Sequence, residues 1–180
     1  MAERAALLIA VESFFEAGPP LPYAATDWNE LARALPAAGY RSEKCLQISG
    51  HRTTKAALES QLRRLPKLVG KVDSLLVAIA TRGFSHKDRG YLVCADTLPA
   101  DPLETSFPVV ELLSALTRTR CQEIVMLLDI DPLVLSVGLA SRLDPGLRVS
   151  ELTKLFDEST SCVGLLSDRK STRLNSSHRT

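Results

Sequence analysis

Ile124–Pro132, with the sequence IVMLLDIDP, is the stretch that decides the fold. Five apolar residues in a row lead into Asp129, Ile130 and Asp131. A short, unbroken apolar run indicates a strand that is buried on both faces, as at the centre of a parallel sheet. Open α/β sheets carry their sites at the carboxyl ends of such strands, so the two aspartates are candidates for function.

A second stretch, Ser74–Ala80 (SLLVAIA), has the same pattern and runs into Thr81, Arg82 and Gly83. Two buried strands, each followed by charged residues, predict one place to look for function. We expect the side chains of Arg82 and Asp131 to lie together there, at the carboxyl ends of neighbouring strands.

Strands and helices alternate along the rest of the chain. Further strands are predicted at Ala5–Val11, Glu43–Ile48 (an edge strand), Tyr91–Ala95 (one arm of a hairpin) and Ser161–Leu166, and the strand of the opening stretch spans Cys121–Asp129. Apolar stripes at helical spacing predict helices through Trp28, Leu31 and Leu35, at Ala57–Leu65, at Val109–Leu116 and at Leu152–Phe156. Asp27 can cap or charge the first turn of the first helix, and Gly39 ends it. Thr53 or Thr54 can cap the second helix, and Ser150 can cap the last.

Between these elements we expect loops at Phe84–Gly90 and Ala95–Glu104 and a turn at Asp144–Gly146, and the pattern of Leu133–Leu143 is ambiguous. The alternation of strands with helices predicts an α/β fold. We expect a three-layer sandwich with a mostly parallel central sheet and helices on both faces.

Composition excludes several classes of protein. The 180 residues suffice for one domain, the net charge of +1 gives no electrostatic basis for binding nucleic acid, and no apolar run approaches the length that spans a membrane. The N-terminus indicates a first strand rather than a signal peptide. The four cysteines are widely spaced without a CxxC motif, which favours reduced structural thiols. We therefore expect a cytoplasmic protein without a metal or another cofactor.

Residues 168–180 differ in character from the rest. The sequence DRKSTRLNSSHRT has one leucine and no periodicity, so it cannot help to bury a core. It resembles the peptide encoded by sequencing-adapter DNA at the end of a reading frame. We expect a disordered, non-native tail at 168–180 and an α/β domain at 1–167 that is incomplete at its C-terminus.

Six stretches of the chain carry a family resemblance: RAALLIAVESFF, LPYAATDWNELARALPAAGY, HRTTKAALESQLRRL, DSLLVAIATRGFSHKDRGYLVCAD, EIVMLLDIDPL and SCVGLL. In their order and spacing they resemble the caspase-like cysteine peptidases, especially the bacterial members of the peptidase C14 type. The resemblance implies the caspase-like topology and a peptide-sized cleft. It places Asp129, Gly83, Ser13 and Pro132 in that cleft.

The chain departs from the family at the two reactive positions. Arg82 stands where the family has its catalytic histidine, and Asp131 stands where it has the nucleophilic cysteine. Arginine stays protonated at neutral pH and cannot act as a base. A carboxylate is a poor nucleophile toward amides, so the residues argue against peptide cleavage. We hypothesise that Arg82 and Asp131 form a structural salt bridge in place of the dyad.

Three functions follow from these observations. The first is a caspase-like pseudoprotease, a scaffold that binds a peptide or protein. Asp129 would hold a basic residue, and a sheet edge could pair with the same chain or with an active relative. The second is an active cysteine endopeptidase with displaced residues, from His51 or His86 and Cys94 or Cys121. The third is a magnesium-dependent phosphatase, because Asp129 and Asp131 also fit a DxD motif.

Overall fold

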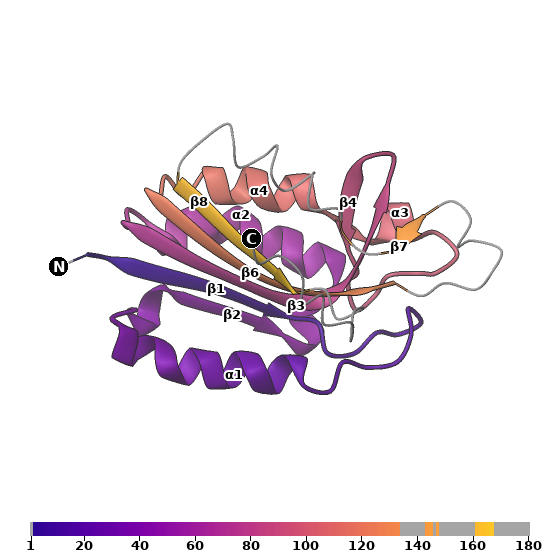
Figure 1. The fold of residues 1–180 in the computed structure, drawn as a ribbon, viewed down its shortest axis with the longest axis horizontal. Helices are drawn as coiled ribbons and strands as arrows, with labels where there is room; N and C mark the ends of the chain where they lie inside the picture. The colour runs from indigo at the N-terminus through magenta and orange to yellow at the C-terminus, as the bar shows by residue number, and fades with distance from the viewer. Residues whose placement is uncertain (1, 134–142, 146, 148–160, 168–180) are drawn as a thin grey trace, which may run out of the picture.

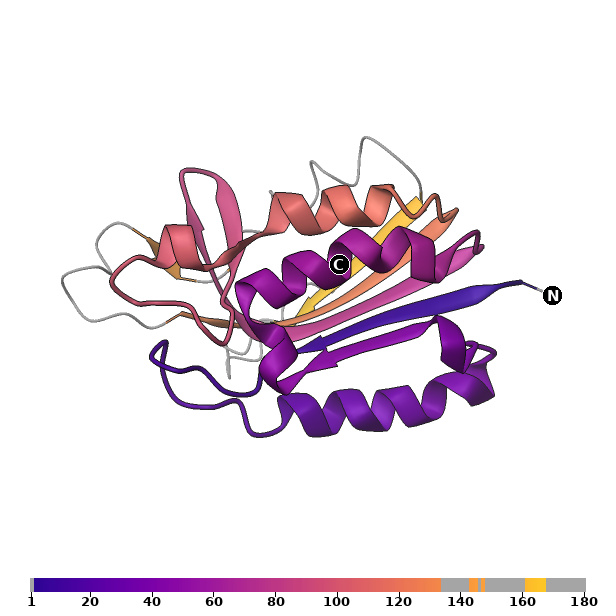
Figure 2. The ribbon, with the colours of Figure 1, turned by 180° about the vertical axis from the view of Figure 1, so that it is seen from behind.

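The protein has three layers, a sheet with helices on each face. A computed structural model describes residues 2–133, 143–145, 147 and 161–167. Figure 1 shows α1 (Ala24–Ala34) along one face of the sheet and α2 (Lys55–Val69) and α4 (Val109–Thr117) on the other, and Figure 2 shows the same layers from behind. The predicted helices on both faces are confirmed.

Within the described residues the sheet has eight strands. Five of them pair in parallel, in the order β2 (Cys45–Ser49), β1 (Arg4–Ala10), β3 (Ser74–His86), β6 (Glu123–Pro132) and β8 (Ser161–Ser167). The other three pair antiparallel around the far end of β3 and are β4 (Arg89–Leu92), β5 (Phe107–Pro108) and β7 (Asp144–Pro145). The expectation of a mostly parallel sheet therefore holds for its central part.

The core follows from the alternation of side chains along the central strands. Leu75, Val77 and Ile79 of β3 face α2 and α4, whereas Leu76 and Ala78 face α1. Because β1 and the first half of β3 are covered on both faces, Ala5–Ala10 and Leu75–Ala80 are all apolar and buried. Helix α1 is fixed to the sheet by Trp28, whose Nε1 lies 2.8 Å from the Ile9 carbonyl oxygen and 3.0 Å from that of Ala78. Trp28 packs as the sequence predicts.

Several short elements connect these layers. Four are one-turn helices: η1 (Leu35–Ala38), η2 (Ser42–Lys44), η3 (Gly50–Thr53) and α3 (Pro102–Thr105). Gly39 ends η1 with a φ of 84°, the left-handed conformation that favours glycine. Within the described ranges, every helix falls short of the length and apolarity that crossing a bilayer requires.

The structure corrects four local expectations. The stretch Phe84–Gly90 is not a loop, because β3 continues to His86 and a two-residue turn at Lys87 and Asp88 leads into β4. Asp144 and Pro145 pair with β3 as β7 rather than forming a turn. The predicted loop after Ala95 contains α3. Arg82 accordingly lies inside β3 and not beyond its end.

The fourth correction concerns the start of α2. Neither Thr53 nor Thr54 caps this helix through its hydroxyl group. A carboxylate oxygen of Asp96 accepts the hydrogen bond from the Lys55 backbone N–H at 2.8 Å instead. The residues 134–142 of the ambiguous segment and the helix expected at Leu152–Phe156 lie outside the described residues.

Candidate functional site

Arg82 and Asp131 are direct neighbours in the sheet. The parallel register of β3 and β6 pairs Ala80 with Asp129 and Arg82 with Asp131. Paired residues on neighbouring strands point to the same face, and residues two apart share that face. Arg82, Asp129 and Asp131 therefore all point toward the side of the sheet that α1 covers.

The guanidinium group of Arg82 is fastened to the loop that follows β1. Its Nη1 donates a hydrogen bond of 3.0 Å to the carbonyl oxygen of Ala17, and its central carbon lies 4.7 Å from the centroid of the Phe14 ring. Only 7% of the Arg82 surface is exposed. Because the Leu21 N–H also donates to the Glu12 carbonyl oxygen at 2.7 Å, the loop closes on itself around this arginine.

Gly18 allows this close approach. A Cβ atom at Gly18 would lie 2.7 Å from Arg82 Nη1, and the φ of Gly18 is +112°. Few side chains adopt that backbone conformation, so glycine serves both the turn and the packing. The loop is thus shaped to receive the arginine.

Two opposing effects act on the charge of Arg82. Burial lowers the pKa of its guanidinium group, and the nearby Asp131 carboxylate raises that pKa. Arginine keeps its proton at neutral pH under such conditions. The site therefore presents a fixed cation where a proton-transferring group would be needed for catalysis by a cysteine–histidine pair.

Asp129 and Asp131 line a small pocket beside this cation. The pocket has a volume of about 210 Å³ and is lined by Leu21, Pro22, Tyr23, Ala24, Ala80, Asp129 and Asp131. Its outer wall is the chain that enters α1, where Tyr23 is 66% exposed. A pocket of this size accommodates one side chain rather than a drug-sized ligand. Two carboxylates and one guanidinium leave the site with one net negative charge.

The other cleft residues expected from the sequence are more dispersed. Ser13 is exposed in the loop after β1, and Pro132 is half-buried at the end of β6. A Cβ at Gly83 would lie 2.7 Å from Ile130 Cγ2 and 3.1 Å from Leu147 Cγ, on the face opposite Arg82. Close packing of β3 accounts for this glycine.

The described cysteines lie in apolar surroundings. Burial raises the pKa of Cys94 to about 12, with the Asp96 carboxylate adding to the effect. Burial also raises the pKa values of Cys45 and Cys121. All three are free thiols. Of the two candidate histidines, His51 is exposed in η3. His86, which lies in the stretch predicted to be a loop, is half-buried in β3.

No group of three or more His, Cys, Asp or Glu side chains that could hold a metal occurs in the described part of the chain. The sequence also gave no reason to expect Phe14, Ala17 or the wall Leu21–Ala24 at the site. Their segment is irregular, and the only available signal was its position directly after a buried strand, where α/β sheets place their sites.

Comparisons with known proteins bear on the fold and the family. The crystal structure of protein GSU0716 from Geobacter sulfurreducens superposes with a TM-score of 0.52 at 13% sequence identity, over 72% of this chain and 50% of that one. The chain thus spans about half the length of that protein, and the likeness shows the fold alone. No curated protein matches the sequence. Residues 3–130 match the family model described as the caspase domain, so this chain belongs to the caspase domain family of the peptidase C14 type.

Proposed function

We propose that this chain is a caspase-like pseudoprotease that binds a peptide or protein segment without cleaving it. The observation that carries the proposal is the register of β3 and β6, which pairs Arg82 with Asp131. The resemblance assigns the two reactive positions of the family to these residues. Arginine cannot take the proton of a nucleophile at neutral pH, and a carboxylate attacks amides poorly. The hydrogen bond from the Arg82 guanidinium to the Ala17 carbonyl oxygen also gives this cation a structural contact.

The bound segment contains a lysine or an arginine. Asp129 and Asp131 both line the pocket of about 210 Å³, and the net negative charge of the site favours a cationic side chain. Leu21 and Tyr23 offer apolar surface for the methylene groups of such a side chain.

A binding titration tests this specificity. Short labelled peptides with a central arginine, lysine or glutamine are titrated with the protein, and fluorescence polarisation is measured. We expect the basic peptides to bind more tightly by about tenfold, a difference of ~1.4 kcal/mol. Asp129→Asn and Asp131→Asn should reduce that preference, whereas Asp27→Asn, an exposed carboxylate of α1 outside the pocket, should not. Equal binding of basic and neutral peptides would refute the role of Asp129.

A second experiment tests the loss of catalysis. The double change Arg82→His with Asp131→Cys restores the residue types of the family, and we expect weak peptidase activity from it and none from the unaltered chain. Cleavage of a protein substrate by the unaltered chain would overturn the proposal. The two single variants serve as controls, since neither contains a complete dyad.

The two alternatives have tests of their own. An active endopeptidase with displaced residues requires a reactive thiol, and the raised pKa values of Cys45, Cys94 and Cys121 oppose that. Fold-dependent labelling by a covalent cysteine probe would support it. A magnesium-dependent phosphatase would be supported by hydrolysis of a small phosphoester that Asp129→Asn abolishes. Free thiols also suit a reducing compartment, and we propose the cytoplasm as the location.

A further inference from the structure

Arg82 is connected to two sides of the pocket that Asp129 and Asp131 line. In the sheet it pairs with Asp131, one of the two carboxylates of that pocket of about 210 Å³. Its Nη1 also donates a hydrogen bond of 3.0 Å to the carbonyl oxygen of Ala17, in the loop that leads to the lining residues Leu21–Ala24. Arg82 is not itself a lining residue, so its charge acts on the pocket from behind the wall.

The position of this guanidinium group is fixed by its surroundings. Its central carbon lies 4.7 Å from the centroid of the Phe14 ring, and Gly18 packs so closely that a Cβ there would lie 2.7 Å from Nη1. Because only 7% of the Arg82 surface is exposed, water screens the charge weakly, and its field extends over several ångströms. The Asp131 carboxylate raises the pKa of Arg82, which is consistent with an interaction between the two charges.

A basic side chain that enters the pocket meets both attraction and repulsion. The carboxylates of Asp129 and Asp131 attract it, and the fixed cation of Arg82 repels it. We propose that Arg82 is a specificity-determining residue, a resident cation that limits how tightly the pocket holds a lysine or an arginine. This inference rests on the proposed function, because it concerns the same pocket. Removal of the Arg82 charge should therefore increase the preference for basic segments.

Titration of Arg82→Gln with labelled peptides tests the proposal by fluorescence polarisation. Peptides with a central arginine or lysine should bind to this variant about tenfold more tightly than to the unaltered chain, and a peptide with a central glutamine should change by less than about twofold. A variant with a damaged pocket would lose affinity for all three peptides, so structural damage cannot produce this result. Arg82→Lys keeps the positive charge and should show no such gain.

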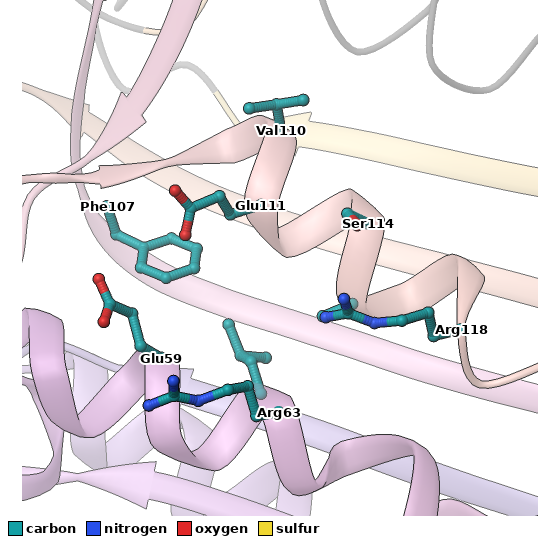
Figure 3. A pocket seen from close by; sticks show the side chains of 9 residues that line it. Glu59, Arg63, Phe107, Val110, Glu111, Ser114 and Arg118 are labelled. Carbon is teal, nitrogen blue, oxygen red and sulfur yellow. The ribbon is translucent and has the colours of Figure 1, made fainter.

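A second acidic place on the protein needs its own control. A groove of about 360 Å³ between α2 and α4, on the other face of the sheet, is lined by Glu59, Glu111 and other residues. Figure 3 shows these two carboxylates on either side of the Phe107 ring, with the Arg63 guanidinium at the same end. The variant Glu59→Gln/Glu111→Gln should leave the affinity for basic peptides unchanged. Loss of binding in this variant would place the peptide in the groove and overturn the inference.

Matched controls separate this inference from the proposed function. Arg64→Gln removes the same charge from an exposed position of α2 and should leave binding unchanged. Thermal melting checks that each variant is folded at the assay temperature, and Arg82→Met is a second neutral variant for the same titration. Equal binding of basic and neutral peptides by the unaltered chain would refute the proposed function itself. A preference for basic peptides that neither neutral variant increases would overturn this inference alone.

Discussion

Arg82 is the residue on which the local structure of the site depends. It connects the centre of the sheet to the loop after β1 through the Ala17 carbonyl and the Phe14 ring, and it lies beside Asp131. A buried hydrogen bond from a charged donor contributes about 1.5–3 kcal/mol, and a desolvated cation–aromatic contact contributes up to about 2 kcal/mol. The salt bridge predicted from the sequence would add to both.

We predict that Arg82→Ala lowers the free energy of unfolding by about 2–4 kcal/mol, because it removes these contacts and leaves Asp131 without its neighbouring cation. Chemical denaturation measures the change. Phe14→Leu, which removes only the ring beneath the guanidinium, should cost less than Arg82→Ala. A melting temperature of Arg82→Ala equal to that of the unaltered chain would show that the arginine contributes nothing to stability.

Gly18→Ala provides a second prediction at the residue scale. Alanine at a φ of +112° is strained, and its Cβ would displace Arg82 Nη1, so we expect a loss of about 1–3 kcal/mol. In the Arg82→Ala background only the backbone strain persists. The double variant should therefore lose at least ~0.5 kcal/mol less than the sum of the single variants. Additive losses would contradict the contact between the two residues.

At the scale of elements, the sequence predicted the strands and helices whose apolar pattern lies within the element itself. The apolar runs of β1, β3 and β6 and the helical stripes of α1, α2 and α4 all correspond to observed elements. The extension of β3 through Thr81 and Ser85 could not be predicted, because these buried polar residues are stabilised by pairing with distant strands. The Thr81 hydroxyl, for example, donates to the Val93 carbonyl oxygen at 2.7 Å.

The start of α2 also depends on a residue that is distant in the sequence. Its first N–H is bound by Asp96, which is 41 residues away in the sequence, so no local pattern could reveal the cap. Asp96→Ala should lower the free energy of unfolding by about 1 kcal/mol, the usual cost of a lost N-terminal cap. Thr54→Ala, at one of the two positions where the sequence predicts the cap, should have a smaller effect in the same denaturation experiment.

The candidate site, too, could be predicted from the sequence only where it depends on regular strands. The pairing of Arg82 with Asp131 follows from two strands of similar pattern that enter one parallel sheet, and the register bears out their adjacency. The contact of Arg82 with Ala17 does not follow, because it depends on how the irregular loop after β1 folds back over the strands. The salt bridge itself is still a prediction.

For the molecule as a whole, stability should fall at alkaline pH in a way that reports on Cys94. Burial raises its pKa from an ordinary value of 9.0 to about 12 in the folded state, so the folded state holds the proton longer than the unfolded state does. The stabilising contribution is complete below pH 9 and is lost as the pH rises from 9 toward 12. The loss is about 1.4 kcal/mol per pH unit within that range.

Denaturation curves of the unaltered chain and of Cys94→Ala, recorded at neutral pH and at a pH of about 10.5, measure this effect. Other groups titrate in the same range, so the quantity of interest is the difference between the two proteins. That difference should shrink at the higher pH. A difference that is independent of pH would show that the Cys94 thiol is accessible to water.

Trp28 is the single tryptophan of the chain, and its indole N–H is held by two carbonyl groups of the sheet. The fluorescence of Trp28 therefore reports on the position of α1, the helix that follows the pocket wall. Its emission maximum should shift to longer wavelength when α1 separates from the strands. Peptides that enter beside Tyr23 and Ala24 can therefore be followed by intrinsic fluorescence, without any label.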